Sequence, residues 1–205
     1  MDGDTVAVGT VREDSAARGV GGNPFDNTEF SSGAVYVFHR SELDGWQAQA
    51  YVKAINAERN DSFGQSLALS GNLLAVGADL DSSAANQIDG DADDNSLTSA
   101  GSAQLYHRTG ATWSPASCIK PSKPGFADRF GFSVAMDGGL LAVSAYGEDS
   151  DATGINGDMD NNLALFSGAA YTFDVVASRR SASRTARLVK ATSLHSATQH
   201  DRRTF

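Results

Sequence analysis

An internal repeat constrains the fold of this chain more than any other feature of its sequence. The segment FGQSLALSGNLLAVGAD, which begins at Phe63, returns as FGFSVAMDGGLLAVSAY, which begins at Phe130. A third copy, MDGDTVAVGTV, begins at Met1 and lacks the Phe-Gly half. Self-similarity at a fixed period indicates a repeat architecture, in which each unit packs on its neighbours.

The rest of the chain keeps the same period. The offset from Trp46 to Trp113 equals the offset between the two Phe-Gly segments, and each tryptophan is followed seven residues later by a lysine, Lys53 or Lys120. A glycine precedes each of the apolar runs AVYVFHR, SAQLYHR and AAYTFD, and these glycines are Gly33, Gly101 and Gly168. The chain therefore holds two nearly full units and one unit that has lost its first strand.

Each unit reads as four short strands. The stretch SLALSGNLLAVGA predicts two strands around a tight Ser-Gly-Asn turn, and SVAMDGGLLAVSA repeats this pattern around Asp-Gly-Gly. Glycine and asparagine supply the positive φ angles that such a hairpin needs. AVYVFHR alternates small and large residues as a strand does, and WQAQAYVK makes a fourth strand. A repeating four-stranded antiparallel sheet is a propeller blade, so the predicted fold class is all-β, with about three blades in an open, incomplete array.

The repeat divides the chain into four parts. We expect an incomplete first blade in residues 1–54, a second blade in 55–121 and a third blade in 122–176. Residues 177–205 break the pattern, because the sequence ASRRSASRTARLVKATSLHS stands where the fourth strand of the third unit should be. We expect this basic tail to lie outside the blades and to be disordered or loosely helical.

The charge of the chain is uneven. Its net charge is −9, but residues 177–205 hold seven basic residues and one acidic residue. Residues 1–174 therefore carry 9 basic and 24 acidic residues, a net charge of 9 − 24 = −15. A body this acidic repels nucleic acid and attracts cations. No apolar stretch approaches the length of a membrane-spanning helix, so we expect no nucleic-acid partner and no membrane span.

The first residues are not predicted to form a secretion signal. Met1 is followed directly by Asp2, Gly3 and Asp4, without the basic start and the apolar segment of a signal peptide. Either the chain is cytosolic, or its true N-terminus is missing from this sequence.

The long loops between the second and third strands carry the candidate metal ligands. Oxygen-bearing side chains recur there at every second residue, beside a glycine that permits a sharp turn, in the two sets Asp89, Asp91, Asp93 and Asn156, Asp158, Asp160. Calcium takes six to eight hard oxygen ligands, and alternate residues of a curled loop can direct several of them at one point. The alternative is an acidic, glycine-rich loop that is merely solvated, and the sequence leaves both readings open.

The single cysteine and the repeated histidines are interpreted as structural. Cys118 falls in a strand of the repeat and is read as a half-buried strand residue rather than a reactive thiol. His39 and His107 occupy equivalent positions, each before an arginine, at the end of a predicted strand. No spacing suggests a Ser-His-Asp arrangement, and no phosphate-binding glycine loop follows a strand.

The Phe-Gly start, the strand LAVGA and the strand GAVYVF resemble the FG-GAP repeats that build the β-propeller of integrin α chains and occur in many bacterial surface proteins. The resemblance covers about residues 1–174. The proline of the Gly-Ala-Pro element is absent, since Ala78 is followed by Asp79 and Ala145 by Tyr146. Many members of this family hold Ca²⁺ in the hairpin between the first and second strands. Here those hairpins are too short, and the acidic residues lie one loop later.

The resemblance implies a non-enzymatic propeller segment that serves extracellular adhesion or ligand binding, with Ca²⁺ as its cofactor. We expect a protein or glycan ligand at the rim formed by the acidic loops, and either further propeller repeats or self-association at the open ends. The implied location is extracellular or at the cell surface. Two alternatives remain: a propeller-type hydrolase that uses loop carboxylates as acid and base, and a structural or non-functional fragment of a larger propeller.

Overall fold

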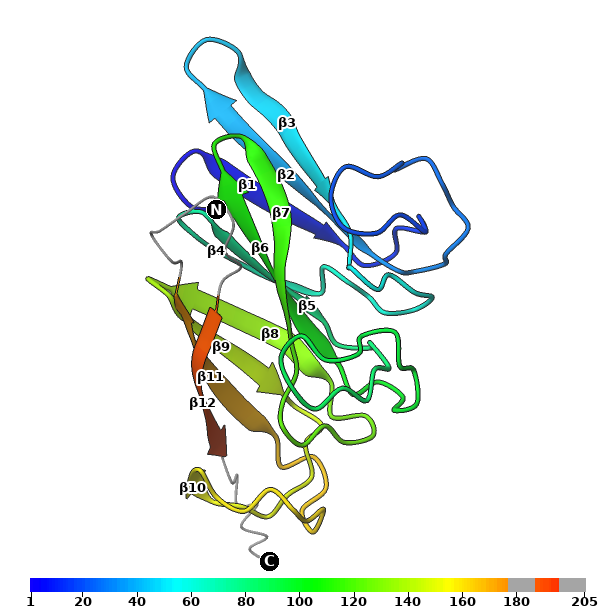
Figure 1. Ribbon diagram of the computed structural model, residues 1–205, viewed down its shortest axis with the longest axis vertical. Helices are drawn as coiled ribbons and strands as arrows, with labels where there is room; N and C mark the ends of the chain where they lie inside the picture. Colours follow the sequence, from blue (N-terminus) through cyan, green and yellow to red (C-terminus); the bar gives the residue numbers. More distant parts are fainter. Residues whose placement is uncertain (177–186, 196–205) are drawn as a thin grey trace, which may run out of the picture.

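The computed structural model describes residues 1–176 and the backbone of residues 187–195, and every regular element in this part of the chain is a β-strand. Three antiparallel sheets follow one another along the long axis of the molecule (Figure 1). The strands are β1 Thr5–Thr10, β2 Ala34–Ser41, β3 Gly45–Val52, β4 Ser66–Ser70, β5 Leu73–Ala78, β6 Ser102–Thr109, β7 Thr112–Ile119, β8 Phe130–Asp137, β9 Leu140–Ala145, β10 Gly154–Ile155, β11 Ala169–Val176 and β12 Arg187–His195.

The order of the strands confirms the predicted all-β fold of incomplete propeller blades. The first sheet has the order β1-β2-β3, the second β4-β5-β6-β7, and the third β8-β9-β11-β12 with β10 at its far edge. The first sheet has three strands because the copy of the repeat that begins at Met1 lacks the Phe-Gly strand. Two-residue turns join β4 to β5 and β8 to β9, as the glycine-containing hairpins predicted.

The basic tail differs from the sequence-based expectation. Residues 187–195 form β12, which pairs antiparallel with β11 in a register that sets Ala169 opposite His195. The expectation that residues 177–205 lie outside the blades is therefore wrong for 187–195, while 177–186 and 196–205 lie outside the described residues. The physical reason is that the free edge of β11 offers backbone donors and acceptors to any extended segment. The blade boundaries after residues 54 and 121 stay a prediction.

Position in the array decides how deeply equivalent strands are buried. All six residues of β5 are buried, because the second sheet has a neighbour on each face. The equivalent strand β9 alternates between buried and more exposed residues, and β1 buries only Thr5. The nearly identical sequences LAVGA and LAVSA thus meet different surroundings, as expected for a repeat whose units share their cores.

Two hydrophobic cores lie between the sheets, and a phenylalanine of the repeat sits in each. Phe63 packs in the core between the first and second sheets, with its ring 6.0 Å from that of Tyr106. Phe130 occupies the core between the second and third sheets, 5.4 Å from the ring of Tyr171. Both phenylalanines form isolated parallel bridges to the preceding blade, Phe63 with Gly33 and Phe130 with Gly101. Each blade is therefore tied to its predecessor by backbone as well as by side chains.

Glycine is required where these bridges form. Gly101 has a φ of +82°, and a Cβ there would lie 2.1 Å from the carbonyl oxygen of Phe130. Gly168 has a φ of +74°, but its Cβ would meet nothing closer than 3.4 Å. A Cβ on Gly77 would lie 1.9 Å from the carbonyl oxygen of Gly131, whereas Ser144 stands at the matching position of the third sheet. Close backbone packing therefore makes glycine necessary at Gly101 and Gly77, at the junction between the second and third sheets.

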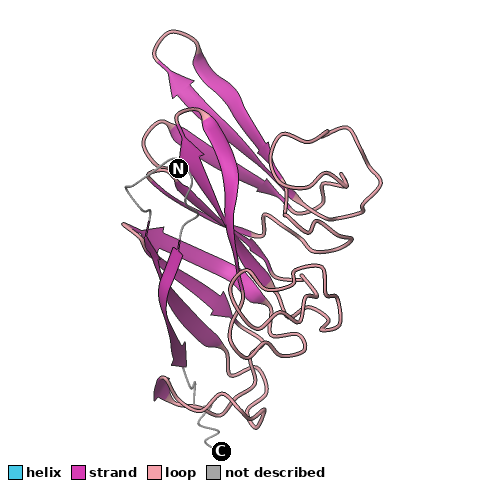
Figure 2. Ribbon diagram, in the orientation of Figure 1, coloured by secondary structure: helices cyan, strands magenta, loops and turns pink. Residues whose placement is uncertain are grey.

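The three long loops emerge on one side of the sheets (Figure 2). They comprise residues 11–33, 79–101 and 146–168, and they join β1 to β2, β5 to β6 and β9 to β11, with the two-residue strand β10 inside the third loop. The described residues include no helix long and apolar enough to cross a membrane.

Candidate functional site

A buried lysine holds the base of the first long loop. The Lys53 side chain is fully buried, and its Nζ donates to Glu13 Oε2 and to Ser32 Oγ, each at 2.7 Å. Burial lowers the pKa of Lys53, and the neighbouring Glu13 carboxylate opposes that shift. The side chain at this repeat position therefore fastens the last strand of the blade to both ends of its loop.

The second blade repeats this arrangement with other acceptors. Lys120 Nζ donates to the carbonyl oxygens of Ser83 at 2.6 Å and Gly101 at 2.7 Å, and lies 3.4 Å from Asp81 Oδ1. Both side chains of the ion pair are buried. The lysines that recur after Trp46 and Trp113 are therefore structural, because their donors are used within the loops.

The three predicted metal ligands of the second loop have three separate partners. Asp89 Oδ1 accepts a hydrogen bond from the backbone N of Cys118 at 2.9 Å. Asp91 Oδ1 accepts from the backbone N of Asp93 at 3.1 Å. Asp93 Oδ1 lies 2.9 Å from the guanidinium of Arg18, which belongs to the first long loop. The spacing of every second residue brings these side chains into one loop, but each carboxylate is directed at a different group.

The third loop shows the same pattern. Asp158 Oδ1 accepts from the backbone N of Asp160 at 2.9 Å, and Asp160 Oδ1 lies 2.6 Å from Lys123 Nζ. Asn156 has a φ of +57°, close to the +54° of its counterpart Asp89, so the two loops share this left-handed turn. Asn156 also lines a cavity between the second and third sheets.

Residues 1–175, whose side chains are described, contain no group of three or more His, Cys, Asp and Glu side chains placed to hold a metal ion. Calcium needs six to eight oxygens around one point, and the carboxylates of each predicted set are spread over separate partners. In this arrangement, the acidic residues build loop turns and pair with a base from a neighbouring segment. Calcium binding by Asp89, Asp91, Asp93, Asn156, Asp158 and Asp160 remains a prediction.

Two buried carboxyl groups were missed by the reading of the sequence. Asp61 Oδ2 accepts from the backbone N of Glu58 at 3.0 Å, and Asp128 Oδ2 accepts from that of Gly125 at 2.6 Å. Burial raises the pKa of Asp61 to about 8 and that of Asp128 to about 6. Their signal was present in the sequence, because each stands two residues before Phe-Gly and the pair therefore keeps the period of the repeat. Equal geometry in both linkers indicates that they fold the linker.

A hydrogen-bonded network fills the first junction, between the first and second sheets. Tyr106 Oη donates to the carbonyl oxygen of Lys53 at 2.6 Å. Gln104 Nε2 donates to Asn56 Oδ1 at 2.8 Å, and Asn56 Nδ2 donates to Asp81 Oδ2 at 2.7 Å. All five residues are buried, so the network links the last strand of the first sheet, the following linker and the second sheet without solvent.

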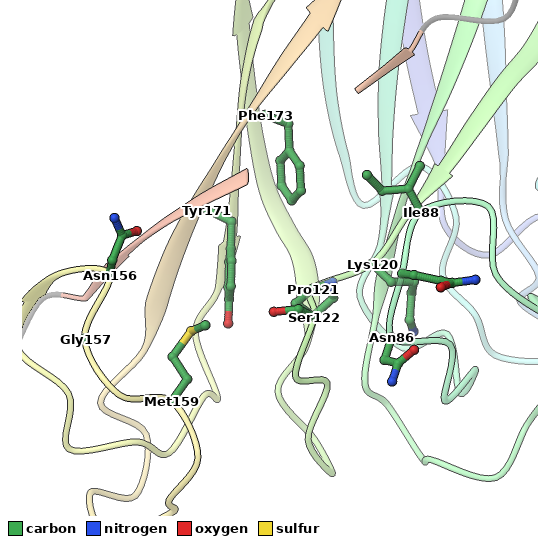
Figure 3. A pocket seen from close by; sticks show the side chains of 11 residues that line it. Asn86, Ile88, Lys120, Pro121, Ser122, Asn156, Gly157, Met159, Tyr171 and Phe173 are labelled. Carbon is green, nitrogen blue, oxygen red and sulfur yellow. The ribbon is translucent and has the colours of Figure 1, made fainter. Parts of the chain in front are cut away.

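The second junction, between the second and third sheets, has other side chains at these positions. Tyr171 replaces Gln104, Phe173 replaces Tyr106, and Lys123 replaces Asn56. A cavity of about 410 Å³ opens there, lined by Asn86, Gln87, Ile88, Lys120, Pro121, Ser122, Asn156, Gly157, Met159, Tyr171 and Phe173 (Figure 3). The two junctions therefore share a backbone plan and differ in what occupies the space beneath the loops.

Cys118 is more deeply buried than the half-buried position expected for it, and the role expected for His39 and His107 stays a prediction. Cys118 is buried, and burial raises the pKa of its thiol to about 12, so the thiolate is disfavoured. The arginines that follow the two histidines lie over the repeated tryptophans, with Arg108 5.3 Å from the ring of Trp113 and Arg40 5.9 Å from that of Trp46. These contacts repeat from blade to blade, as architectural contacts do.

Comparison with known proteins agrees with the period of the repeat. The family model described as FG-GAP repeat matches residues 46–106 and 113–173, more than half of the chain. Both matches begin at a repeated tryptophan and end at the aromatic residue of the third strand, Tyr106 or Phe173. No curated protein matches the sequence. The chain therefore belongs to the FG-GAP repeat family, as an integrin-like segment of propeller repeats.

Proposed function

We propose that this segment is a binding protein rather than an enzyme, and that the rim formed by its three long loops receives a protein or glycan ligand outside the cell. The observation that carries the proposal is the gathering of these loops on one side of the sheets (Figure 2). Ion pairs join them to their neighbours, from Arg18 to Asp93 at 2.9 Å and from Lys123 to Asp160 at 2.6 Å. Loops that a rigid scaffold presents together are the usual seat of binding sites.

A hydrolase would need carboxyl groups that line a cavity and act as acid and base. Asp128 and Glu148 line one cavity, and the pKa of Asp128 is raised to about 6. Raised pKa values mark candidate catalytic acids, but structural groups have them too. Asp61 occupies the equivalent place at the filled first junction, with a higher pKa and the same backbone contact. Because the feature recurs where the space is filled by the protein itself, a binding role is the better explanation.

Calcium is the cation that we propose for the acidic rim. To coordinate it, the loops would have to exchange present partners for the ion, above all Arg18 for Asp93 and Lys123 for Asp160. Sites assembled from such loops are expected to be weak, with a dissociation constant of about 10⁻⁴ to 10⁻³ M, as in extracellular modules. Calorimetric titration with Ca²⁺ should give heat for the parent chain and much less for an Asp91→Ala/Asp158→Ala variant. Equal heats would mean that these loops are only solvated.

We also propose that further propeller repeats pack on the free face of the first sheet. Val8 and Trp46 are 45% and 47% exposed there, whereas their counterparts Val76 and Trp113 are buried against the first sheet. The Arg40–Trp46 stack reproduces the Arg108–Trp113 stack of that interface. Sedimentation should show self-association of the isolated chain, and Trp46→Glu should reduce it. A monomer at every concentration would contradict this proposal.

The binding role can be tested on an immobilised glycan array and on extracellular matrix proteins. Asp93→Asn/Asp160→Asn removes charge from the rim, and Asp44→Asn removes a charge from the β2–β3 turn as the matched control. We expect the rim variant to lose at least tenfold in apparent affinity, and the control to bind like the parent. Equal binding by all three proteins would show that the rim is not the binding surface.

A further inference from the structure

The second junction contains an open site that the first junction fills with its own side chains. At the first junction, Gln104 donates to Asn56, Asn56 donates to Asp81, and Tyr106 donates to the carbonyl oxygen of Lys53. At the second junction, Tyr171 and Phe173 replace Gln104 and Tyr106 and line a cavity (Figure 3). A cavity of about 410 Å³ lies within the 300–1,000 Å³ range of small-molecule sites.

This cavity has an apolar wall drawn from both sheets. Ile88 and Pro121 come from the second-blade side, and Met159, Tyr171 and Phe173 come from the third (Figure 3). Tyr171 and Phe173 are themselves buried, so their position is fixed by the core around Phe130. The wall therefore combines two aromatic side chains held by the core with the flexible side chain of Met159.

An acidic compartment adjoins the apolar one. A second cavity of about 430 Å³ shares the lining residues Asn86, Ser122 and Met159 with the first, so the two cavities lie side by side. Its walls carry the carboxyl groups of Asp128, Glu148 and Asp160, against one base, Lys123. Asp128 and Glu148 are both 5% exposed. Lys120, at the floor of the apolar part, already donates to two carbonyl groups and pairs with Asp81.

We propose that this cleft, formed by the apolar wall and the acidic compartment, binds an amphipathic cation: an aromatic or aliphatic group that carries an ammonium or guanidinium. The apolar part packs against Met159, Tyr171 and Phe173, where a ring face also attracts a nearby cation. The charged end lies toward Asp128 and Glu148, whose carboxyl groups line the acidic compartment and can form charge-assisted hydrogen bonds with a cation. The cleft shares Asp160 and parts of two long loops with the proposed rim, and it goes beyond that proposal by placing a small-ligand site in the junction beneath those loops.

The first test uses 2-phenylethylamine, with 2-phenylethanol as the neutral probe of nearly equal size. Titration followed by ¹H–¹⁵N spectra should show the amine bound with a dissociation constant on the order of 1 mM or lower, in line with the affinity per atom of small ligands. Shifts should centre on Met159, Tyr171 and Ser122. The alcohol should bind at least tenfold more weakly. Equal binding by both probes, or shifts elsewhere, would overturn the proposal.

Variants separate the site from the fold. Met159→Trp places a large ring in the cleft and should abolish binding, and Ser122→Phe does the same from the opposite wall if the first variant folds poorly. Asp128→Asn should weaken amine binding about tenfold. Asp61→Asn makes the same change at the filled first junction and should bind like the parent. Retention of amine affinity by a folded Met159→Trp or Ser122→Phe variant would rule the site out.

A third binding measurement distinguishes a cationic side chain of a protein from a free amine. N-acetyl-Phe-Arg-amide presents the same chemistry as part of a peptide chain. Tenfold tighter binding of this peptide than of 2-phenylethylamine assigns the cleft to a basic aromatic segment of a protein partner. Equal or weaker binding of the peptide assigns it to a free amine. Failure of both probes to bind overturns the proposal, and binding at the rim would be unaffected by either result.

Discussion

The two junctions of this molecule are built on one plan, yet one is filled and the other is hollow. In both, a phenylalanine of the following blade bridges to a glycine of the preceding blade. In the first junction, Gln104, Tyr106 and Asn56 close the space with hydrogen bonds. In the second, Tyr171 and Phe173 leave about 410 Å³. The repeat therefore determines which backbone segments of neighbouring blades pack together. A few side chains determine whether the interface is closed by hydrogen bonds or contains a cavity.

The two junctions should also differ in how much free energy of unfolding a single substitution costs. A buried polar network is stable only when every member is satisfied, because each orphaned donor or acceptor keeps its desolvation cost. The first junction is therefore intolerant of single changes. The lining of the second junction also includes the apolar side chains of Ile88, Pro121, Met159 and Phe173, which carry no hydrogen-bonding N–H or O–H group.

The largest effect is expected where backbone meets backbone. Gly101→Ala places a Cβ 2.1 Å from the carbonyl oxygen of Phe130 at a positive φ, so the second junction must open. We expect a loss of about 3 kcal/mol or more in the free energy of unfolding. Gly168→Ala, at a similar φ but with 3.4 Å of clearance, should lose only about 1 kcal/mol. Urea denaturation measures both, and equal losses would show that φ alone, not the junction, makes glycine necessary.

A smaller effect is expected from breaking the network of the first junction. Asn56→Leu removes the donor to Asp81 and the acceptor of Gln104, and should cost about 2 to 4 kcal/mol. Lys123→Leu changes the matching residue of the second junction, whose ion pair with Asp160 is exposed, and should cost about 1 kcal/mol or less. Thermal unfolding of the two variants gives the comparison. A Lys123 variant as damaged as the Asn56 variant would refute the contrast between the junctions.

The last comparison between the junctions is a difference in pH dependence. Burial holds the pKa of Asp61 at about 8 and that of Asp128 at about 6, both above the ordinary 3.8. The folded chain thus keeps a proton that the unfolded chain loses, and the stability from each group is full below pH 3.8 and is lost as the pH rises through the folded pKa. Asp61→Asn should therefore gain stability over the parent from pH 4 to pH 8, at no more than about 1.4 kcal/mol per pH unit. The gain of Asp128→Asn should level off near pH 6, and identical profiles would contradict the assignment.

Much of the fold could be predicted because the period of the repeat is visible in the linear order of the residues, without knowledge of any contact in space. The repeat of Phe63 at Phe130 led to blades, their hairpins and the short first sheet. β12 could not be predicted, because pairing with β11 depends on backbone groups at an open edge rather than on a residue pattern. The strand sequence RLVKATSLH carries none of the marks of the repeat.

The candidate site was less predictable, since it depends on contacts between distant residues. The alternate spacing of Asp89, Asp91 and Asp93 suggested convergence, but Arg18 of another loop pairs with Asp93. Tyr171, Pro121 and Met159 line one cavity although they lie far apart in the sequence, and no local sequence pattern predicts this. The acids before the two Phe-Gly pairs could have been found, because they keep the period of the repeat in the sequence.

The bridge from each phenylalanine to the preceding blade has a consequence for how such chains grow in evolution. Each family match runs from the last strand of one sheet to the third strand of the next, and so contains a whole junction, with Phe63 or Phe130 inside it. Duplication of this stretch in a gene would insert a complete interface between two existing blades, and every new surface would meet one that already fits it. Duplication of a single sheet would instead separate a phenylalanine from its glycine. The stretch that can be duplicated without loss of contacts is thus the interface between two blades, rather than a single blade.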